Sequence, residues 1–204
     1  MTTIAQLMRT APVIPVLVVD DAAQARPLAQ ALVAGGLPLL EVTLRTPAAL
    51  EVIAEMAKVP GAIVGAGTVL NPADLAAAIA AGAQFIVSPG LTEPLARAAI
   101  AARVPFLPGI SNAADIMRGL DLGLDRFKFF PAVASGGLPT LSALAAVFGQ
   151  IRFCPTGGIT ETTAPDWLAK PFIECVGGSW LAARGETDWA AIQRRAAAAA
   201  KLKP

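Results

Sequence analysis

Short apolar segments alternate with longer, Ala-rich amphipathic segments along the whole chain. The apolar segments are rich in Val, Ile, Leu and Phe and have the length of β-strands, whereas the amphipathic segments have helical spacing of their apolar residues. The pattern predicts strands over residues 13–19, 39–45, 62–69, 84–89, 106–110, 126–131, 152–156 and 173–178.

Helix start and stop signals lie between these strands. Asn71-Pro72, Thr92-Glu93-Pro94 and Ser111-Asn112 each offer a capping residue or an early proline, which is typical of a helix N-terminus. Glycines at the far ends of the amphipathic segments, as in Gly35-Gly36 and Leu122-Gly123, are typical of C-terminal caps.

Strand and helix recur about every 20–25 residues, the spacing expected of βα units in a parallel sheet. Eight such units predict an α/β fold of the (β/α)₈ barrel type, with residues 1–204 as one domain. Residues 1–9 are expected to form a short helix across the bottom of the barrel. The competing fold is a doubly wound open sheet, which usually needs fewer strands at this length.

The composition limits the catalytic and binding chemistry that the chain can perform. The chain contains no His, so histidine-ligated metals, Ser–His and Cys–His nucleophiles and histidine acid–base catalysis are excluded. The net charge of +1, without a basic stripe, argues against a nucleic-acid partner. Cys154 and Cys175 lie in apolar strands, as expected for reduced core thiols in a cytoplasmic protein.

Hydrophobic residues make up 55% of the chain, which raises the possibility of a membrane protein. The uncharged stretch 129–151 is long enough to span a bilayer, but Pro131, Gly136, Gly137 and Pro139 interrupt it. The N-terminus lacks the pattern of a signal peptide. We therefore expect a cytoplasmic protein with no membrane partner.

Lys128 stands in the middle of the Phe-rich segment 126–131. An amine in water is protonated and is a poor nucleophile, whereas apolar surroundings favour the neutral, reactive form. A lysine that extends from the strand to solvent, or pairs with an acid, is the alternative interpretation.

Glu41, Thr43 and Arg45 share one face of their predicted strand, because side chains alternate along a strand. The aliphatic face of Val42 and Leu44 suits the helical ring, so Glu41 and Arg45 should point toward the barrel axis. Arg45 can then hold a carboxylate with two parallel hydrogen bonds. Taken alone, the pattern favours an internal Glu–Arg pair that only fills the barrel.

Two glycine-rich turns follow the last two predicted strands, at Gly157-Gly158 and at Gly177-Gly178. Backbone amides at helix N-termini bind phosphate, and barrels often place such a site after strands seven and eight. The turns therefore indicate a phosphate site, although tight turns also need glycine. A third glycine-containing segment, 65–70, lacks the remaining residues of both nucleotide-binding motifs.

The chain resembles the 2-keto-3-deoxy-6-phosphogluconate (KDPG) and 4-hydroxy-2-oxoglutarate aldolases. The likeness extends from residue 13 to residue 180. It is carried, in the family's order, by Leu40-Glu41-Val42-Thr43-Leu44-Arg45-Thr46, Gly65-Ala66-Gly67-Thr68-Val69-Leu70, Ser88-Pro89-Gly90-Leu91-Thr92-Glu93-Pro94, Phe127-Lys128-Phe129-Phe130-Pro131-Ala132, Phe153-Cys154-Pro155-Thr156-Gly157-Gly158-Ile159 and Gly177-Gly178-Ser179-Trp180.

The resemblance implies a class I aldolase of the Entner–Doudoroff pathway, which cleaves a phosphorylated keto acid to pyruvate and glyceraldehyde 3-phosphate. Lys128 would be the Schiff-base lysine and Glu41 the acid–base group, without a metal or other cofactor. It also implies a homotrimer. The substrate-binding residues would be Arg45 and Thr68 for the carboxylate, Pro89 and Phe130 for the walls, Thr156, and Gly157, Gly158, Gly178 and Ser179 for the phosphate.

Several alternatives remain at the level of sequence. Two of them are other substrates of the same aldol cleavage: 4-hydroxy-2-oxoglutarate and the 6-phosphogalactonate epimer. A phosphosugar isomerase or a non-catalytic phosphate-binding barrel would keep the glycine-rich turns but would not need a lysine in the sixth strand.

Overall fold

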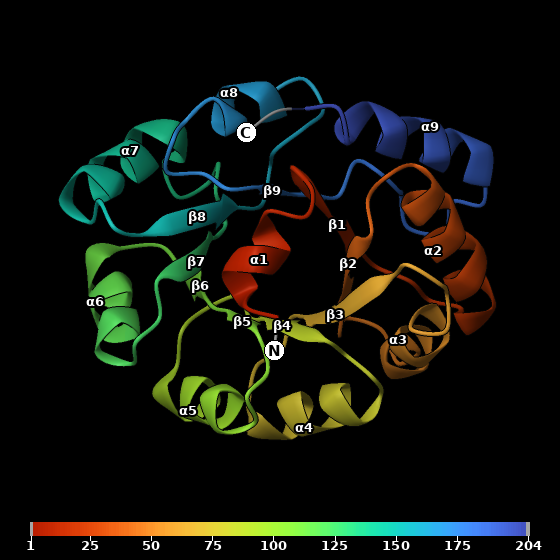
Figure 1. Ribbon diagram of the computed structural model, residues 1–204, viewed down its shortest axis with the longest axis horizontal. Helices are drawn as coiled ribbons and strands as arrows, with labels where there is room; N and C mark the ends of the chain where they lie inside the picture. The colour runs from red at the N-terminus through yellow and green to blue at the C-terminus, as the bar shows by residue number, and fades with distance from the viewer. Residues whose placement is uncertain (1, 203–204) are drawn as a thin grey trace.

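The computed structural model describes residues 2–202 as a ring of helices around parallel strands (Figure 1). Met1, Lys203 and Pro204, which belong to the predicted domain 1–204 and, for Met1, to the predicted N-terminal helix, lie outside the described residues. The strands are β1 (Val13–Leu17), β2 (Leu39–Thr43), β3 (Ile63–Gly67), β4 (Phe85–Val87), β5 (Phe106–Leu107), β6 (Gly109–Ile110), β7 (Arg126–Phe129), β8 (Arg152–Pro155) and β9 (Val176–Gly178).

The strands pair in parallel around the axis, as predicted for a (β/α)₈ barrel. One sheet has the order β5-β4-β3-β2-β1-β9 and the other the order β6-β7-β8. The bridges Phe153↔Ile173 and Thr156↔Gly177 join the β8 segment to the β9 segment. The predicted fifth strand is split into β5 and β6 at Pro108, which has no N–H to donate to a neighbouring strand.

The helices begin where the capping signals predict. Asn71 and Asn112 accept hydrogen bonds from backbone amides at the starts of their helices, and Thr92 occupies the corresponding N-cap position. The helices are α1 (Ile4–Met8), α2 (Ala25–Ala34), α3 (Ala49–Met56), α4 (Pro72–Ala80), α5 (Glu93–Ala101), α6 (Ala113–Asp121), α7 (Gly137–Val147), α8 (Ala164–Leu168) and α9 (Trp189–Ala199), with a 3₁₀ turn η1 (Ala22–Gln24).

Two apolar regions result from the alternation along the strands. The larger lies between the strands and the helical ring and includes Val42, as predicted. The smaller lies inside the barrel, where Leu7 and Met8 of α1 pack with Phe85 and both cysteines. Helix α1 therefore covers the N-terminal end of the barrel, as expected. None of the helices within residues 2–202 is long and apolar enough to cross a bilayer.

Candidate active site

The predicted site residues gather at the C-terminal end of the barrel. A cavity of about 340 Å³ opens there. Nine of the predicted residues line it: Arg45, Thr68, Pro89, Lys128, Phe130, Thr156, Gly157, Gly158 and Ser179. Most of them lie one or two residues beyond the C-terminal end of a strand.

Lys128 and Glu41 meet inside the barrel. Lys128 Nζ donates a hydrogen bond to Glu41 Oε1 at 3.0 Å, and their side chains are only 5% and 4% exposed. The Lys128 ammonium also lies 5.3 Å from the ring centroid of Phe130, within range of a cation–π contact. The lysine therefore does not extend to bulk solvent; it pairs with an acid at the floor of the cavity.

Arg45 does not pair with Glu41, so the expected alternative of an internal Glu–Arg pair is wrong. It lies beyond the end of β2 and is exposed, and its Nε donates to Thr68 Oγ1 at 3.3 Å. Thr68 has φ of 59°, a left-handed conformation that costs a non-glycine residue free energy. The guanidinium and hydroxyl together form a polar wall of the cavity.

The first glycine turn presents backbone groups to the cavity. Gly157 and Gly158 have φ of 104° and 79°, which glycine adopts without a steric penalty. Within residues 2–202, the amides of Gly157, Gly158 and Ser179 donate to no backbone acceptor. Because these amides have no backbone acceptor among the described residues, they can donate hydrogen bonds to a bound anion.

The structure corrects one part of the phosphate prediction. Neither glycine turn leads directly into a helix, since α8 begins only at Ala164 and α9 at Trp189. The turns therefore offer loop amides rather than helix N-termini. Gly178 is buried against the Trp180 ring and does not line the cavity, whereas its neighbour Gly177 does.

Four further residues line the cavity that were not among the predicted site residues: Val16, Val18, Ile159 and Gly177. Two of these had a signal, because Gly177 and Ile159 lie beside predicted residues. The apolar Val16 and Val18 had none, since nothing in a valine-rich strand shows which residues border a cavity.

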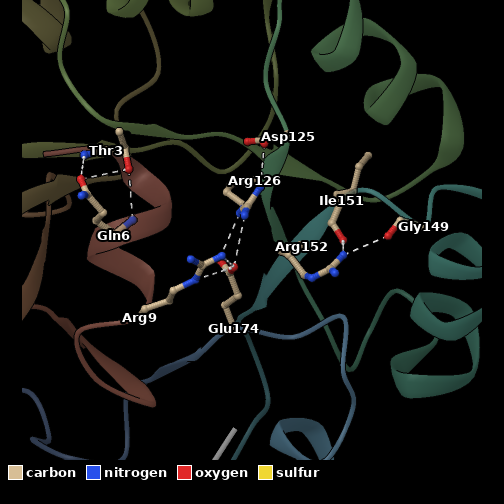
Figure 2. Close-up of polar contacts among 9 residues, drawn as sticks. All are labelled: Thr3, Gln6, Arg9, Asp125, Arg126, Gly149, Ile151, Arg152 and Glu174. Carbon is tan, nitrogen blue, oxygen red and sulfur yellow. Dashed lines mark hydrogen bonds and ion pairs between the residues drawn. The ribbon is translucent and has the colours of Figure 1, made fainter.

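A larger cavity, of about 650 Å³, lies at the opposite end of the barrel. Glu174, the one acid among the described residues that line it, is already paired. Glu174 accepts hydrogen bonds from Arg9 (2.7 Å from Nη2) and Arg126 (3.1 Å from Nε), and Arg126 also contacts Asp125 (Figure 2). This network joins the chain just after α1 to the starts of β7 and β9.

The two cysteines lie between these ends, in the apolar interior. A side-chain hydrogen bond with Cys154, together with burial, raises the pKa of the Cys175 thiol. Because a thiol is a nucleophile only when ionised, Cys175 stays unreactive at neutral pH. The two residues are free, buried thiols, as predicted.

Known proteins resemble the chain over nearly all of its length. The family model for KDPG and KHG aldolase matches residues 4–195. The 2-dehydro-3-deoxy-phosphogluconate aldolase of Zymomonas mobilis is 60% identical over 203 residues, covering 100% of this chain and 98% of that protein. Its crystal structure with 3-phosphoglycerate has a TM-score of 0.97, covering 98% of this chain and 96% of that one.

Two further relatives bear on the chemistry. The KHG/KDPG aldolase of Escherichia coli is 55% identical over 181 residues, covering 88% of this chain and 85% of that protein. The KDPG aldolase of Legionella pneumophila, solved with pyruvate captured at low pH as a covalent carbinolamine intermediate, is 41% identical with a TM-score of 0.94. That match covers 98% of this chain and 99% of that one.

Proposed function

The chain belongs to the KDPG and KHG aldolase family, and we propose that Lys128 and Glu41 are the residues with which it cleaves its substrate. The enzyme is a carbon–carbon lyase that converts 2-dehydro-3-deoxy-6-phosphogluconate to pyruvate and D-glyceraldehyde 3-phosphate. The observation that carries the residue assignment is the buried Lys128–Glu41 pair at the floor of a cavity.

The reaction begins when the Lys128 ammonium passes a proton to Glu41 and the resulting neutral amine attacks the C2 ketone of the substrate. Proton transfers give a carbinolamine, and loss of water leaves an iminium that accepts electrons. The carbinolamine described for the Legionella relative supports this first step. Glu41, 3.0 Å from Nζ, is placed to move protons during the attack and dehydration.

Bond cleavage follows from the iminium. Glu41, directly or through a water molecule, removes the proton of the C4 hydroxyl, and the C3–C4 bond breaks as its electrons pass to the iminium. Glyceraldehyde 3-phosphate leaves. The remaining enamine takes a proton at C3, and hydrolysis then releases pyruvate and the free Lys128 amine.

Substrate binding divides between the two sides of the cavity. The Arg45 guanidinium and the Thr68 hydroxyl hold the carboxylate beside C2, because a guanidinium matches a carboxylate with parallel hydrogen bonds. Pro89 and Phe130 form the walls. The amides of the Gly157-Gly158 turn and Ser179, with Thr156 and Gly178 behind them, take the phosphate.

No metal is needed, because the iminium does the work of a Lewis acid; EDTA should leave cleavage unchanged. The whole chain acts as one domain, in a cytoplasmic homotrimer. Cleavage of 4-hydroxy-2-oxoglutarate is a side activity, supported by the name of the Escherichia coli relative.

Borohydride trapping tests the Schiff base. Incubation with pyruvate and borohydride should add one reduced pyruvate adduct per chain, and peptide mapping should place it on Lys128. Lys128→Met should abolish the adduct, whereas Lys170→Met, which changes a lysine outside the site cavity, should not. An adduct on another lysine would refute the assignment of Lys128, and no adduct in the wild type would refute the Schiff-base mechanism.

A further inference from the structure

Two of the three β3 residues whose side chains would point into the barrel are glycines, and the third is Ile63. Gly65 and Gly67 alternate with the outward-facing Val64 and Ala66, which belong to the core beneath the helices. Neither glycine has a positive φ, so the backbone itself would accept alanine. The reason for glycine at both positions is therefore the space that a side chain would occupy, not the backbone conformation.

That space is filled by two other side chains. A Cβ on Gly65 would lie 2.4 Å from Cζ of Phe85. A Cβ on Gly67 would lie 2.3 Å from Oε1, 2.7 Å from Cγ and 2.8 Å from Cδ of Glu41. Carbon atoms do not approach other heavy atoms this closely, so Gly67 is the surface on which the Glu41 side chain lies.

The strand register shows what this contact does. Glu41 pairs with Gly65 across β2 and β3, whereas Gly67 pairs with Thr43. The Glu41 side chain lies over Gly67. It therefore extends from its own residue pair to the next inward-facing pair, toward the C-terminal end of the barrel. This extension brings Oε1 to Lys128 Nζ, which comes from a strand in the other sheet.

We propose that Gly67 is a positioning residue for the reaction: its missing side chain provides the space that lets the Glu41 carboxylate reach Lys128. Gly67 does not line the cavity and acts only through Glu41. The inference rests on the proposed role of Glu41 as the acid–base group.

The substitution Gly67→Ala tests the inference. The new methyl group must displace the Glu41 carboxylate, so kcat should fall by roughly 10²-fold, the effect of moving a catalytic group by about 1 Å. KM should change little, because Arg45, Thr68 and the glycine turn keep their places. A folding defect alone would also lower the apparent kcat at unchanged KM, so kcat is to be expressed per folded enzyme, with the folded fraction measured by circular dichroism; wild-type kcat per folded enzyme would overturn the inference.

A double-mutant cycle isolates the contact. Glu41→Ala removes the three atoms that a methyl group at position 67 would meet. In that background Gly67→Ala should leave kcat within about twofold and should not lower Tm. Gly65→Ala is the matched control: it clashes with Phe85 instead, so Glu41→Ala should not relieve its loss of stability.

The outcomes separate the inference from the function on which it rests. Wild-type kcat in Glu41→Ala would refute the role of Glu41 itself. An inactive Glu41→Ala beside a fully active Gly67→Ala, or equal losses from Gly67→Ala in both backgrounds, would overturn only the inference. If Gly67→Ala alone does not fold, folding of the double variant supports the proposal, and failure of both variants overturns it.

Discussion

Two basic residues on one face of β7 illustrate how the two ends of this barrel differ. Arg126 and Lys128 are two residues apart, both are largely buried, and each pairs with a glutamate from another strand segment. At the N-terminal end, Arg126 shares Glu174 with Arg9 and also contacts Asp125. At the C-terminal end, Lys128 has Glu41 and a 340 Å³ cavity.

The difference lies in how the charges are satisfied and in what adjoins them. A guanidinium remains protonated and spreads its donors over several acceptors, which makes the Arg126 network a structural tie. An amine can lose its proton and form a covalent bond, provided that a base and a ligand can reach it. We therefore expect substitutions at the C-terminal end to affect turnover and those at the N-terminal end to affect stability.

The largest expected effect is that of Glu41→Gln. The amide keeps the size of the side chain but cannot accept a proton, so kcat should fall by roughly 10²–10⁴-fold. Adduct formation with pyruvate should survive better than turnover, although Glu41 also assists dehydration. Steady-state kinetics beside Tm measure this effect, and a well-folded variant with wild-type kcat would refute the catalytic role.

Glu174→Gln should do the reverse. It removes the negative charge shared by Arg126 and Arg9 and leaves the largely buried Arg126 guanidinium only the exposed Asp125 as a counter-charge, which should cost about 2 kcal/mol of stability. Denaturant unfolding measures the loss, and kcat of the folded enzyme at low temperature should be unchanged. A loss of kcat without a loss of stability would contradict the division between the two ends.

Arg45→Ala removes a guanidinium at the site, and its effects on KM and Tm can be compared with the structural role of Arg126. Within the described residues Arg45 makes one side-chain hydrogen bond, from Nε, which leaves its terminal amino groups for a ligand. Its removal should raise KM by roughly 10- to 100-fold with a smaller change in kcat. Because Arg45 is exposed, Tm should stay near the wild-type value; a large fall in Tm would mean that Arg45, too, is structural.

The smallest effect is expected from an exposed pair beside the site. Arg184, after β9, donates two hydrogen bonds of 2.6 Å to Asp20, after β1, and these hydrogen bonds lower the pKa of Asp20 below its usual 3.8. A lowered carboxyl pKa stabilises the fold above the unfolded-state value, and the contribution disappears as the pH falls through the folded-state value. Solvent screens this pair, so the contribution is small.

The measurement for this pair is the difference in Tm between wild type and Asp20→Asn. It should be slight at neutral pH and should shrink as the pH falls below the unfolded-state value of about 4, and it should disappear once Asp20 in the folded wild type, whose pKa is lower, is also protonated. A difference that grows as the pH falls would contradict the pairing.

Much of the fold could be predicted because its determinants are local. Short apolar segments placed the eight predicted strands, and capping residues such as Asn71 placed helix starts, since both signals act over a few neighbouring residues. Lys128 was recognisable by the same local contrast with its Phe-rich strand, and the Gly157-Gly158 turn by its composition. Resemblance to a family supplied the remaining candidate roles.

Only the tertiary structure decided which of these residues meet. Glu41 pairs with Lys128, 87 residues away, and not with Arg45 on its own predicted strand. Barrel closure and strand register set this pairing, and both depend on contacts between segments far apart in sequence. For the same reason the sequence indicated glycines in segment 65–70 without revealing that the space beside Gly67 belongs to the Glu41 side chain.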